Sequence, residues 1–233
     1  MKLSGETYEI LRNFSGINGN MLVREGNVVR SLKNSDNAVA RAEINENFPR
    51  EFGIYDLNEF LSCTSVYDDP NLEFKEDHLV ISDTSGAFGS IKYYYTPERL
   101  LKFAPADNPR MPEAEVKFIL SSKRLNMLRK TSSVLGLEDL TISPSSDKTV
   151  AIKVTEVKKF ESEDNETLNS FSDDVEAEFS EQNFRFVFKI ANLKMIDGDY
   201  EVGISSKKIA HFKHLQKPID YWVASELNSK YGD

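Results

Sequence analysis

Ile54-Tyr55-Asp56-Leu57-Asn58-Glu59-Phe60-Leu61 is the stretch that decides the fold of this chain. An extended run ends at Tyr55, and aspartate at position 56 can accept hydrogen bonds from the first turn of a helix. Leu57, Phe60 and Leu61 then recur at helical spacing. The stretch therefore predicts a strand that passes directly into a short helix over residues 57–66, with its apolar side turned inward.

The residues before this stretch predict a first helix and several short strands. Residues 5–18 carry apolar side chains on one side of a helical projection, and Arg12 points away from that side. Asn18-Gly19-Asn20 ends this helix as a turn. Short strand-like runs, separated by polar turns, lie at residues 21–23, 28–29, 38–40, 52–55, 72–75, 78–82 and 88–95.

A proline-rich segment divides the 233-residue chain. Residues 97–112 contain Pro97, Pro105, Pro109 and Pro112, a density that stops both helices and central strands. We interpret the segment as an extended connector between two domains, residues 1–108 and 113–233. Each domain is of ordinary size for an independent core.

The second half repeats the order of the first, which predicts two similar α+β domains in tandem. A strand and a helix are expected at 116–120 and 122–136, and a short helix is expected at 192–196. Asn192 would begin that last helix as Asp56 begins the second. Further strands are expected at 140–143, 149–158, 171–179, 184–189, 199–205, 208–214 and 219–225.

Charge is segregated along the chain. The net charge of −9 excludes a protein that simply coats DNA, since non-specific binding needs a broad basic surface. Residues 116–137, however, contain five basic residues and no acidic one. On a helical projection Lys123, Asn126, Arg129 and Lys130 lie opposite the leucines, whereas Arg124 projects toward the apolar side. This face is either an ordinary solvated surface or a surface that contacts phosphates without reading bases.

The compensating acid is concentrated in residues 161–182, which hold nine acidic residues and no basic one. A solvated loop and edge strand would explain this composition. On the outside of a ring, the same charge would direct DNA toward the hole.

The motifs of catalysis are missing from the sequence, so no enzyme, metal or cofactor is predicted. Gly16-Ile17-Asn18-Gly19 lacks the lysine and hydroxyl of a phosphate loop. His211 and His214 would face opposite sides of a strand. The lone Cys63 follows an apolar helix and is interpreted as a small buried residue in a reducing compartment. Two adjacent carboxylate pairs, Asp68-Asp69 and Asp173-Asp174, have no catalytic partner nearby in the sequence.

Residues 1–18 and 54–61, in their order and spacing, resemble the sliding clamp of T-even-like bacteriophages. Weaker similarity is visible at Ile190-Ala191-Asn192-Leu193-Lys194-Met195 and at Tyr221-Trp222-Val223-Ala224. The acidic segment 161–182 fits the resemblance least well. The resemblance spans most of the chain and rests on structural rather than catalytic motifs.

This resemblance implies a DNA clamp fold in which each domain packs two helices on a curved antiparallel sheet. Three subunits would close head to tail into a pseudo-sixfold ring around double-stranded DNA, with the helices lining the hole. The cations implied to face the DNA are Arg12, Lys123, Arg129, Lys130 and Lys194.

The resemblance also implies partners in the cytoplasm of an infected bacterium: the replicative DNA polymerase, an ATP-dependent clamp loader and late-transcription factors. No membrane partner is expected, because no apolar run is long enough to span a bilayer. A pocket for partner peptides would be built from Leu101, Phe103, Ala104, Pro105, Tyr221, Trp222 and Val223. Trp222 could equally be plain core. Tyr93, Tyr94 and Tyr95 could stack on bases, but a subunit contact or packing against the connector is the preferred interpretation.

Two other functions compete with the clamp. A phage structural or adaptor module of similar fold would bind partners without closing around DNA. A hydrolase using paired carboxylates is the third candidate, and the missing histidine, metal and glycine-loop motifs count against it.

Overall fold

The computed structural model describes residues 1–157, 169–181 and 183–232. Residues 161–168 and Gln182 of the acidic segment lie outside the described residues. The chain divides into two compact units, Met1–Asn108 and Pro109–Asp233, each with its own core.

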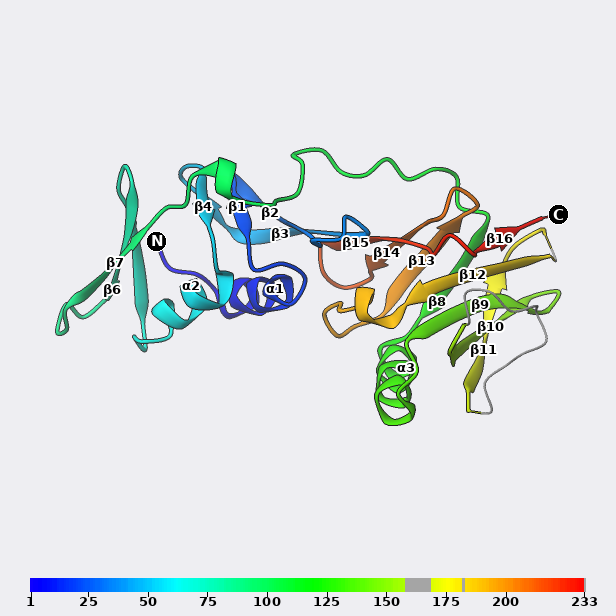
Figure 1. Ribbon diagram of the computed structural model, residues 1–233. Helices are drawn as coiled ribbons and strands as arrows, with labels where there is room; N and C mark the ends of the chain where they lie inside the picture. The colour runs from blue at the N-terminus through cyan, green and yellow to red at the C-terminus, as the bar shows by residue number, and fades with distance from the viewer. Residues whose placement is uncertain (158–168, 182, 233) are drawn as a thin grey trace. The chain divides into compact units, whose positions relative to one another are not determined.

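Two α-helices pack side by side in the N-terminal unit (Figure 1). Helix α1 (Gly5–Ser15) begins at Ser4, whose Oγ accepts a hydrogen bond from the amide of Thr7 at 3.2 Å. Helix α2 (Leu57–Thr64) begins at Asp56, whose carboxylate accepts from the amides of Asn58 and Glu59. Both predicted helices are therefore confirmed. No helix among the residues described is long and apolar enough to cross a bilayer.

The strands of the N-terminal unit form antiparallel pairs and one three-stranded sheet. Alternate residues of β3 from Ala38 to Ile44 are buried, so this strand is much longer than the predicted 38–40. The sheet β5-β6-β7 leaves β7 at an edge. The pairs are β1 (Met21–Val23) with β4 (Phe52–Ile54) and β2 (Gly26–Leu32) with β3 (Ala38–Phe48); the sheet joins β5 (Pro70–Phe74), β6 (His78–Asp83) and β7 (Ser90–Tyr94).

The first part of the proline-rich segment is bound to this unit. The amide nitrogen of the Asn18 side chain donates to the carbonyls of Leu32 and Lys102, both at 2.8 Å. Gly53 lets the segment approach β4, because a Cβ there would lie 2.1 Å from the carbonyl oxygen of Thr96. Apart from a 3₁₀ turn at Glu98–Leu100, residues 97–112 form no regular structure.

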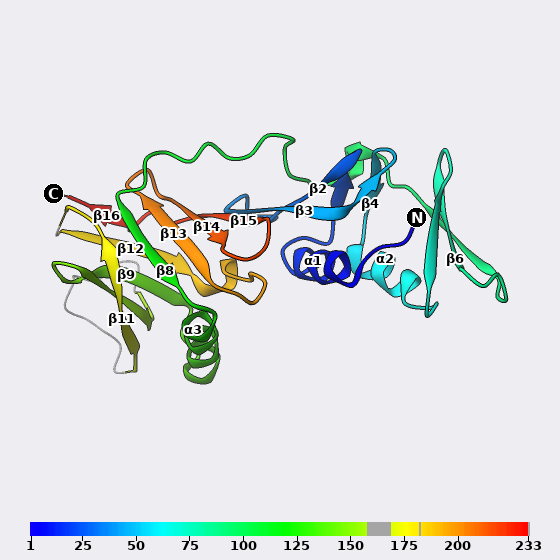
Figure 2. The same ribbon diagram turned by 180° about the vertical axis from the view of Figure 1, so that it is seen from behind.

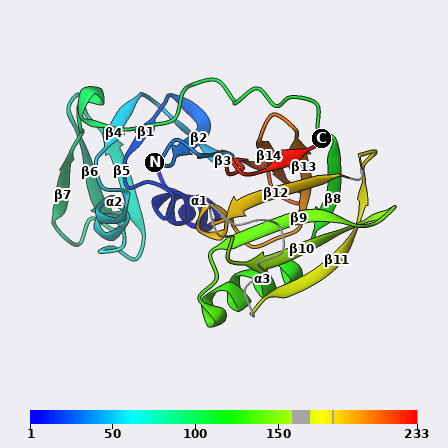
Figure 3. The same ribbon diagram turned by 45° about the vertical axis from the view of Figure 1, so that its right-hand side comes forward.

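The C-terminal unit is built on antiparallel strands that pair in the order β16-β12-β9-β10-β11-β8-β13-β14-β15. Figure 3 shows β12, β9, β10 and β11 in succession. β9–β10, β13–β14 and β14–β15 are consecutive along the chain, whereas β9–β12 and β8–β13 join strands that are distant in sequence. The strands are β8 (Val116–Leu120), β9 (Asp139–Ser146), β10 (Thr149–Thr155), β11 (Phe171–Glu178), β12 (Phe184–Lys189), β13 (Tyr200–Ser205), β14 (Ile209–His214), β15 (Ile219–Ala224) and β16 (Lys230–Tyr231).

Helix α3 (Ser122–Leu135) covers part of this sheet and contacts β10. The predicted helix at 192–196 is wrong: the chain makes only a 3₁₀ turn, η2 (Ile190–Asn192), which Asn192 ends rather than begins. The carbonyls of Leu193 and Met195 instead accept hydrogen bonds from Arg129. Gly198, at φ +154°, then turns the chain against His214, where a Cβ would lie 2.1 Å from the imidazole Nε2.

Candidate nucleic-acid interface and partner site

The exposed face of α3 carries Lys123, Asn126 and Lys130. Ser121 caps the helix, and Leu125 and Leu128 on the opposite side are buried. Positions 123, 126 and 130 follow the i, i+3, i+7 spacing of one helical face. The two lysines therefore extend to solvent from one face of a helix whose register is fixed by its leucines, with Lys123 in the first turn.

Arg129 does not share that exposure. Its guanidinium turns onto the segment after η2, where Nε donates to the carbonyl of Leu193 at 3.1 Å and Nη2 donates to that of Met195 at 3.0 Å. Burial lowers the pKa of the guanidinium. The side chain thus holds the segment 193–195 against α3.

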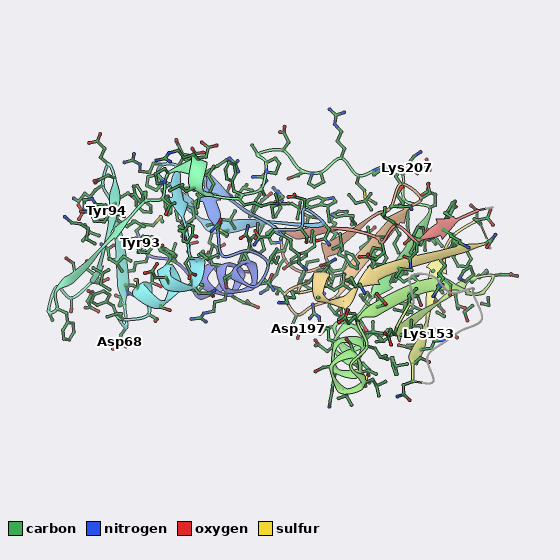
Figure 4. All side chains as sticks on the ribbon, in the orientation of Figure 1. Asp68, Tyr93, Tyr94, Lys153, Asp197 and Lys207 are labelled. Carbon is green, nitrogen blue, oxygen red and sulfur yellow. The ribbon has the colours of Figure 1, made fainter. Side chains whose placement is uncertain are left out.

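Asp197 fixes the same segment at the N-terminal end of α3. The side chain of Asp197 is labelled in Figure 4. Its carboxylate accepts hydrogen bonds from the Ser122 hydroxyl and, at 2.8 Å, from the Asn126 side chain. The carboxylate of Asp199 accepts from the backbone amide of Ser122 at 2.7 Å. The bonds from Ser122 and Asn126 hold the pKa of Asp197 below its ordinary value. A carboxylate beside the lysine face is therefore committed to internal donors.

The remaining cations lie in different settings. Arg12 and Lys194 are exposed, on α1 and directly after η2. Arg124 projects away from the lysine face, as predicted, and its Nε pairs with Asp173 of β11 at 2.8 Å. The exposed lysines of α3 are thus the clearest candidates for contact with phosphate.

The connector residues predicted for a partner pocket have mixed exposure. Ala104 is buried, and its carbonyl accepts from Arg24 at 3.1 Å. The Arg24 guanidinium also lies over the ring of the half-buried Phe103, 5.6 Å from its centroid. Leu101 is half-buried beside Gly53, and Pro105 is exposed.

The C-terminal residues predicted for the same pocket lie mostly in the core. Tyr221 and Val223 are buried, and the Tyr221 hydroxyl accepts from the amide of Ile196 at 3.1 Å. Trp222 is only 6% exposed and stacks on His211, with ring centroids 4.9 Å apart. Tyr221 and Val223 therefore occupy core positions, and Trp222 is buried against His211.

His211 borders an open hollow on the C-terminal unit that sequence reasoning did not identify. The hollow encloses about 290 Å³ and has both apolar and charged walls. His211 Nε2 lies 2.8 Å from Asp220 Oδ1, which orients the ring. The alternation of side chains along β14 could have placed His211 at the surface. We considered it only as an argument against metal binding by His211 and His214. The other lining residues are Met111, Ala114, Lys117, Glu201, Val202, Gly203 and Lys213.

The three consecutive tyrosines at the end of β7 have different surroundings. Tyr93 packs on Phe60 of α2, with ring centroids 5.6 Å apart, and burial raises the pKa of its phenol. Tyr95 packs on Phe52 and beneath Arg50. Tyr94, between them, is 61% exposed.

The histidines of β14 separate as the strand pattern predicts. His214 is buried beside Tyr200, whereas His211 lies against Trp222. Within residues 1–157, 169–181 and 183–232, no group of three or more histidine, cysteine or carboxylate side chains could hold a metal ion.

Comparisons with known proteins agree over both units. The family model described as "gp45 sliding clamp, C terminal" matches residues 117–227, and that described as "DNA polymerase processivity factor" matches residues 4–91. The sliding clamp of Vibrio phage KVP40 is 31% identical over 97% of this chain and 99% of its own length. The sliding clamp of Escherichia phage RB69 is 28% identical over 99% of each chain.

Solved structures show the same fold at much lower identity. Proliferating cellular nuclear antigen from Entamoeba histolytica superposes with a TM-score of 0.66 over 95% of each chain, at 13% identity. A PCNA2–PCNA3 complex from Sulfolobus tokodaii gives 0.65 over 94% of this chain and 95% of that one, at 12% identity. The resemblance predicted from residues 1–18 and 54–61 is confirmed, and the chain belongs to the family of T4-like phage sliding clamps, the processivity factors of DNA polymerase.

Proposed function

We propose that three copies of this chain close head to tail into a ring that encircles duplex DNA and keeps the polymerase on it by topology. The observation that carries the proposal is the lysine face of α3 in a chain of net charge −9. A ring needs no tight affinity for DNA, so a small basic face inside an acidic protein suits it.

Contact with DNA is loose in this proposal. Lys123, Lys130 and Lys194 donate to phosphate oxygens, which carry no base code, and water bridges the remaining distance. Arg129, predicted as a direct contact, instead holds residues 193–195 in place beside those lysines.

The proposed subunit contact uses the edge of β7. Within the described residues β7 pairs only with β6, so one row of its backbone groups has no strand partner. In the C-terminal unit, β11 pairs with β8 only at Ala177 and Glu178, which leaves the same side of residues 171–176 open. Two open edges on different units of one chain permit the head-to-tail contact that closes a ring.

Charge and exposed apolar surface support this contact. Lys92 on β7 would meet a strand that carries Asp173, Asp174 and Glu176. Beside β7, Val66 and Phe88 are 66% and 71% exposed around an open hollow of about 490 Å³. Large exposed apolar side chains next to an open strand edge are typical of a surface that another subunit covers. Tyr94 is also exposed, toward the other end of β7.

The partner site is proposed at the His211 hollow of the C-terminal unit. The exposed Pro105 and the half-buried Leu101 and Phe103 belong to the N-terminal unit and are proposed as a separate apolar contact surface. Trp222 supports His211 from below rather than meeting the partner directly. The polymerase, an ATP-driven clamp loader and late-transcription factors would bind in turn. The protein itself would act without catalysis, in the cytoplasm of the infected host.

Retention on closed circles tests the ring. The protein is loaded with the phage clamp loader and ATP onto a nicked circular plasmid, and its loss is followed before and after a single restriction cut. A ring stays on the circle and slides off the cut ends, so its half-life should fall sharply after the cut. If a bound protein blocks both ends of the cut DNA, the ring should again be retained.

The adaptor alternative gives a different result. A module that binds DNA or a DNA-bound partner without encircling it dissociates at the same rate from circles and from cut molecules. Equal half-lives would therefore exclude the ring and favour the adaptor.

A further inference from the structure

The helices of the two units present opposite charge to solvent. The exposed positions of α1 include Glu6 and Glu9 as well as Arg12, and those of α2 include Glu59 but no basic residue. On these two helices three exposed carboxylates therefore face one exposed cation. Glu6 accepts a weak hydrogen bond from Asn45 at 3.3 Å and keeps its exposure.

The C-terminal unit has the reverse balance. Helix α3 contains no acidic residue, and Lys123 and Lys130 are exposed two turns apart on one face. Seven residues of helix rise about 10.5 Å, so the two ammonium groups can reach different phosphates. Lys194 is exposed on the adjacent segment. The exposed lysines outnumber the nearby carboxylate of Asp197, whose Oδ1 accepts hydrogen bonds from Ser122 and Asn126.

We infer that duplex phosphates are contacted by the helix surface of the C-terminal unit alone, and that the helices of the N-terminal unit repel them. The inference rests on the proposed ring and refines it. Around the hole, three basic sectors would alternate with three acidic ones, so the electrostatic symmetry is threefold although the fold repeats six times. Figure 2 shows α1 and α2 in one unit and α3 in the other, so the two kinds of surface belong to separate rigid elements.

The alternative is that Arg12 acts as an equivalent of Lys130 on a pseudo-symmetric helix. Arg12 lies one turn after Glu9 on the same face, so an approaching phosphate meets a carboxylate at the neighbouring position. At the corresponding position Lys130 has Met127, and its other neighbours on the helix, Asn126 and Ser133, are uncharged. The neighbours, and not the cation itself, distinguish the two sites.

Single substitutions separate the two possibilities. Binding of a short fluorescent duplex to the assembled protein is measured over a range of salt concentrations for the wild type, Lys130→Ala, Lys123→Ala and Arg12→Ala. Each lysine substitution should make the slope of log K against log salt shallower, by about 0.9 for every phosphate that the protein no longer neutralises. Arg12→Ala should leave the slope unchanged.

A gain of binding provides the matched test on the N-terminal unit. The double variant Glu6→Gln with Glu9→Gln removes the repulsion without adding cations, and it should bind the duplex several-fold more tightly at low salt. All variants change exposed side chains, so an unchanged melting temperature and an unchanged assembly mass confirm that folding is intact.

The inference is overturned if Arg12→Ala reduces the salt slope as much as Lys130→Ala, or if the glutamine variant binds no more tightly than the wild type. Failure of the ring itself is seen separately, because the wild type would then leave circular and cut DNA at equal rates. A ring that passes the circle test with a salt slope shared by Arg12 and Lys130 would contradict only this inference.

Discussion

Arg129 and Lys130 are neighbours in sequence, yet the structure gives them different roles. Lys130 extends into solvent, whereas Arg129 donates to the carbonyls of Leu193 and Met195. Charged hydrogen bonds of this kind contribute about 1.5 to 3 kcal/mol each to a mutational difference. Arg129→Ala should therefore lower the free energy of unfolding by about 2 to 3 kcal/mol, as measured by urea denaturation.

Lys130→Ala is the matched control, since it removes a neighbouring cation from the same helix. Its free energy of unfolding should stay within about 0.5 kcal/mol of the wild type. Arg129→Lys should recover only part of the loss, because an ammonium group cannot reproduce the forked donor. Equal effects of the two alanine substitutions would show that the contacts of Arg129 add no stability.

Helical projection could not separate these two residues, because it shows only which side of a helix a residue is on. Arg129 lies at the border of the exposed face, and its role depends on carbonyls sixty-four and sixty-six positions away in the chain. Trp222 posed the same difficulty. Trp222 is buried where its ring stacks on His211, and no local sequence pattern on β15 predicts that contact.

At the scale of elements, Asp197 joins the segment after η2 to the first turn of α3. The side chains of Ser122 and Asn126 lower the pKa of Asp197. The carboxyl group is therefore more acidic in the folded protein than in the unfolded chain, where its pKa is about 3.9. The stabilisation is therefore present above that pH and is lost as the pH falls through the lower, folded-state value.

Asp197→Asn should reveal this linkage. At pH 7 the variant should be less stable by under about 1 kcal/mol, because the carboxylate is exposed. The difference should shrink as the pH falls from the unfolded-chain pKa of about 3.9 through the lower folded-state pKa, because the wild type then also loses its charge. Urea denaturation at pH 7 and through the acidic range measures it, with Asp147→Asn in the β9–β10 turn as a control. A difference that stays constant with pH would contradict the role given to the carboxylate.

Local chemistry predicted the elements that carry their own signals. Ser4 and Asp56 cap the first two helices, and leucines set the inward face of the third. The prediction failed where contacts between distant residues determine the backbone conformation. Residues 192–196 have the pattern of a helix, but the carbonyls of Leu193 and Met195 accept hydrogen bonds from Arg129. Strand β3 continues to Phe48 because every second residue meets the core, although Arg41, Glu43 and Asn45 made it look like a polar turn.

At the scale of the whole molecule, the edge of β7 should govern assembly. The amide of Tyr95 donates to Asp77 in the β6–β7 hairpin, so alternation along the strand directs the amide of Lys92 to the open side. Lys92→Pro removes that donor without removing a bond to β6. Each subunit contact should weaken about fivefold to tenfold, the worth of one hydrogen bond.

Sedimentation equilibrium over a wide concentration range measures this change, with the wild type expected to reach three times the mass of one chain. Lys92→Ala is the control for the lost side chain, and it should weaken assembly less than the proline. If both variants assemble like the wild type, β7 lies outside the contact and the tyrosines at its end pack only within the N-terminal unit.

The family and the fold class could be predicted from short segments, because residues 1–18 and 54–61, in their order and spacing, resemble the sliding clamp of T-even-like phages. The partner site could not be predicted as well. Val202 and His211 lie on the consecutive strands β13 and β14, but Met111 and Lys117 come from a distant part of the sequence, so the full lining of the hollow becomes visible only in three dimensions.

The anchoring of the connector limits how it can behave. Asn18 and Arg24 hold it as far as Ala104, and Glu115 is fixed by its backbone bond to Ile204 and by its carboxylate bonds to Ser206. Only residues 105–114 lie between these anchors, and Pro105, Pro109 and Pro112 are three of those ten. A piece of that length reaches at most about 35 Å, and prolines stiffen it. The connector is thus short and stiff, so it limits how far the two domains can move apart.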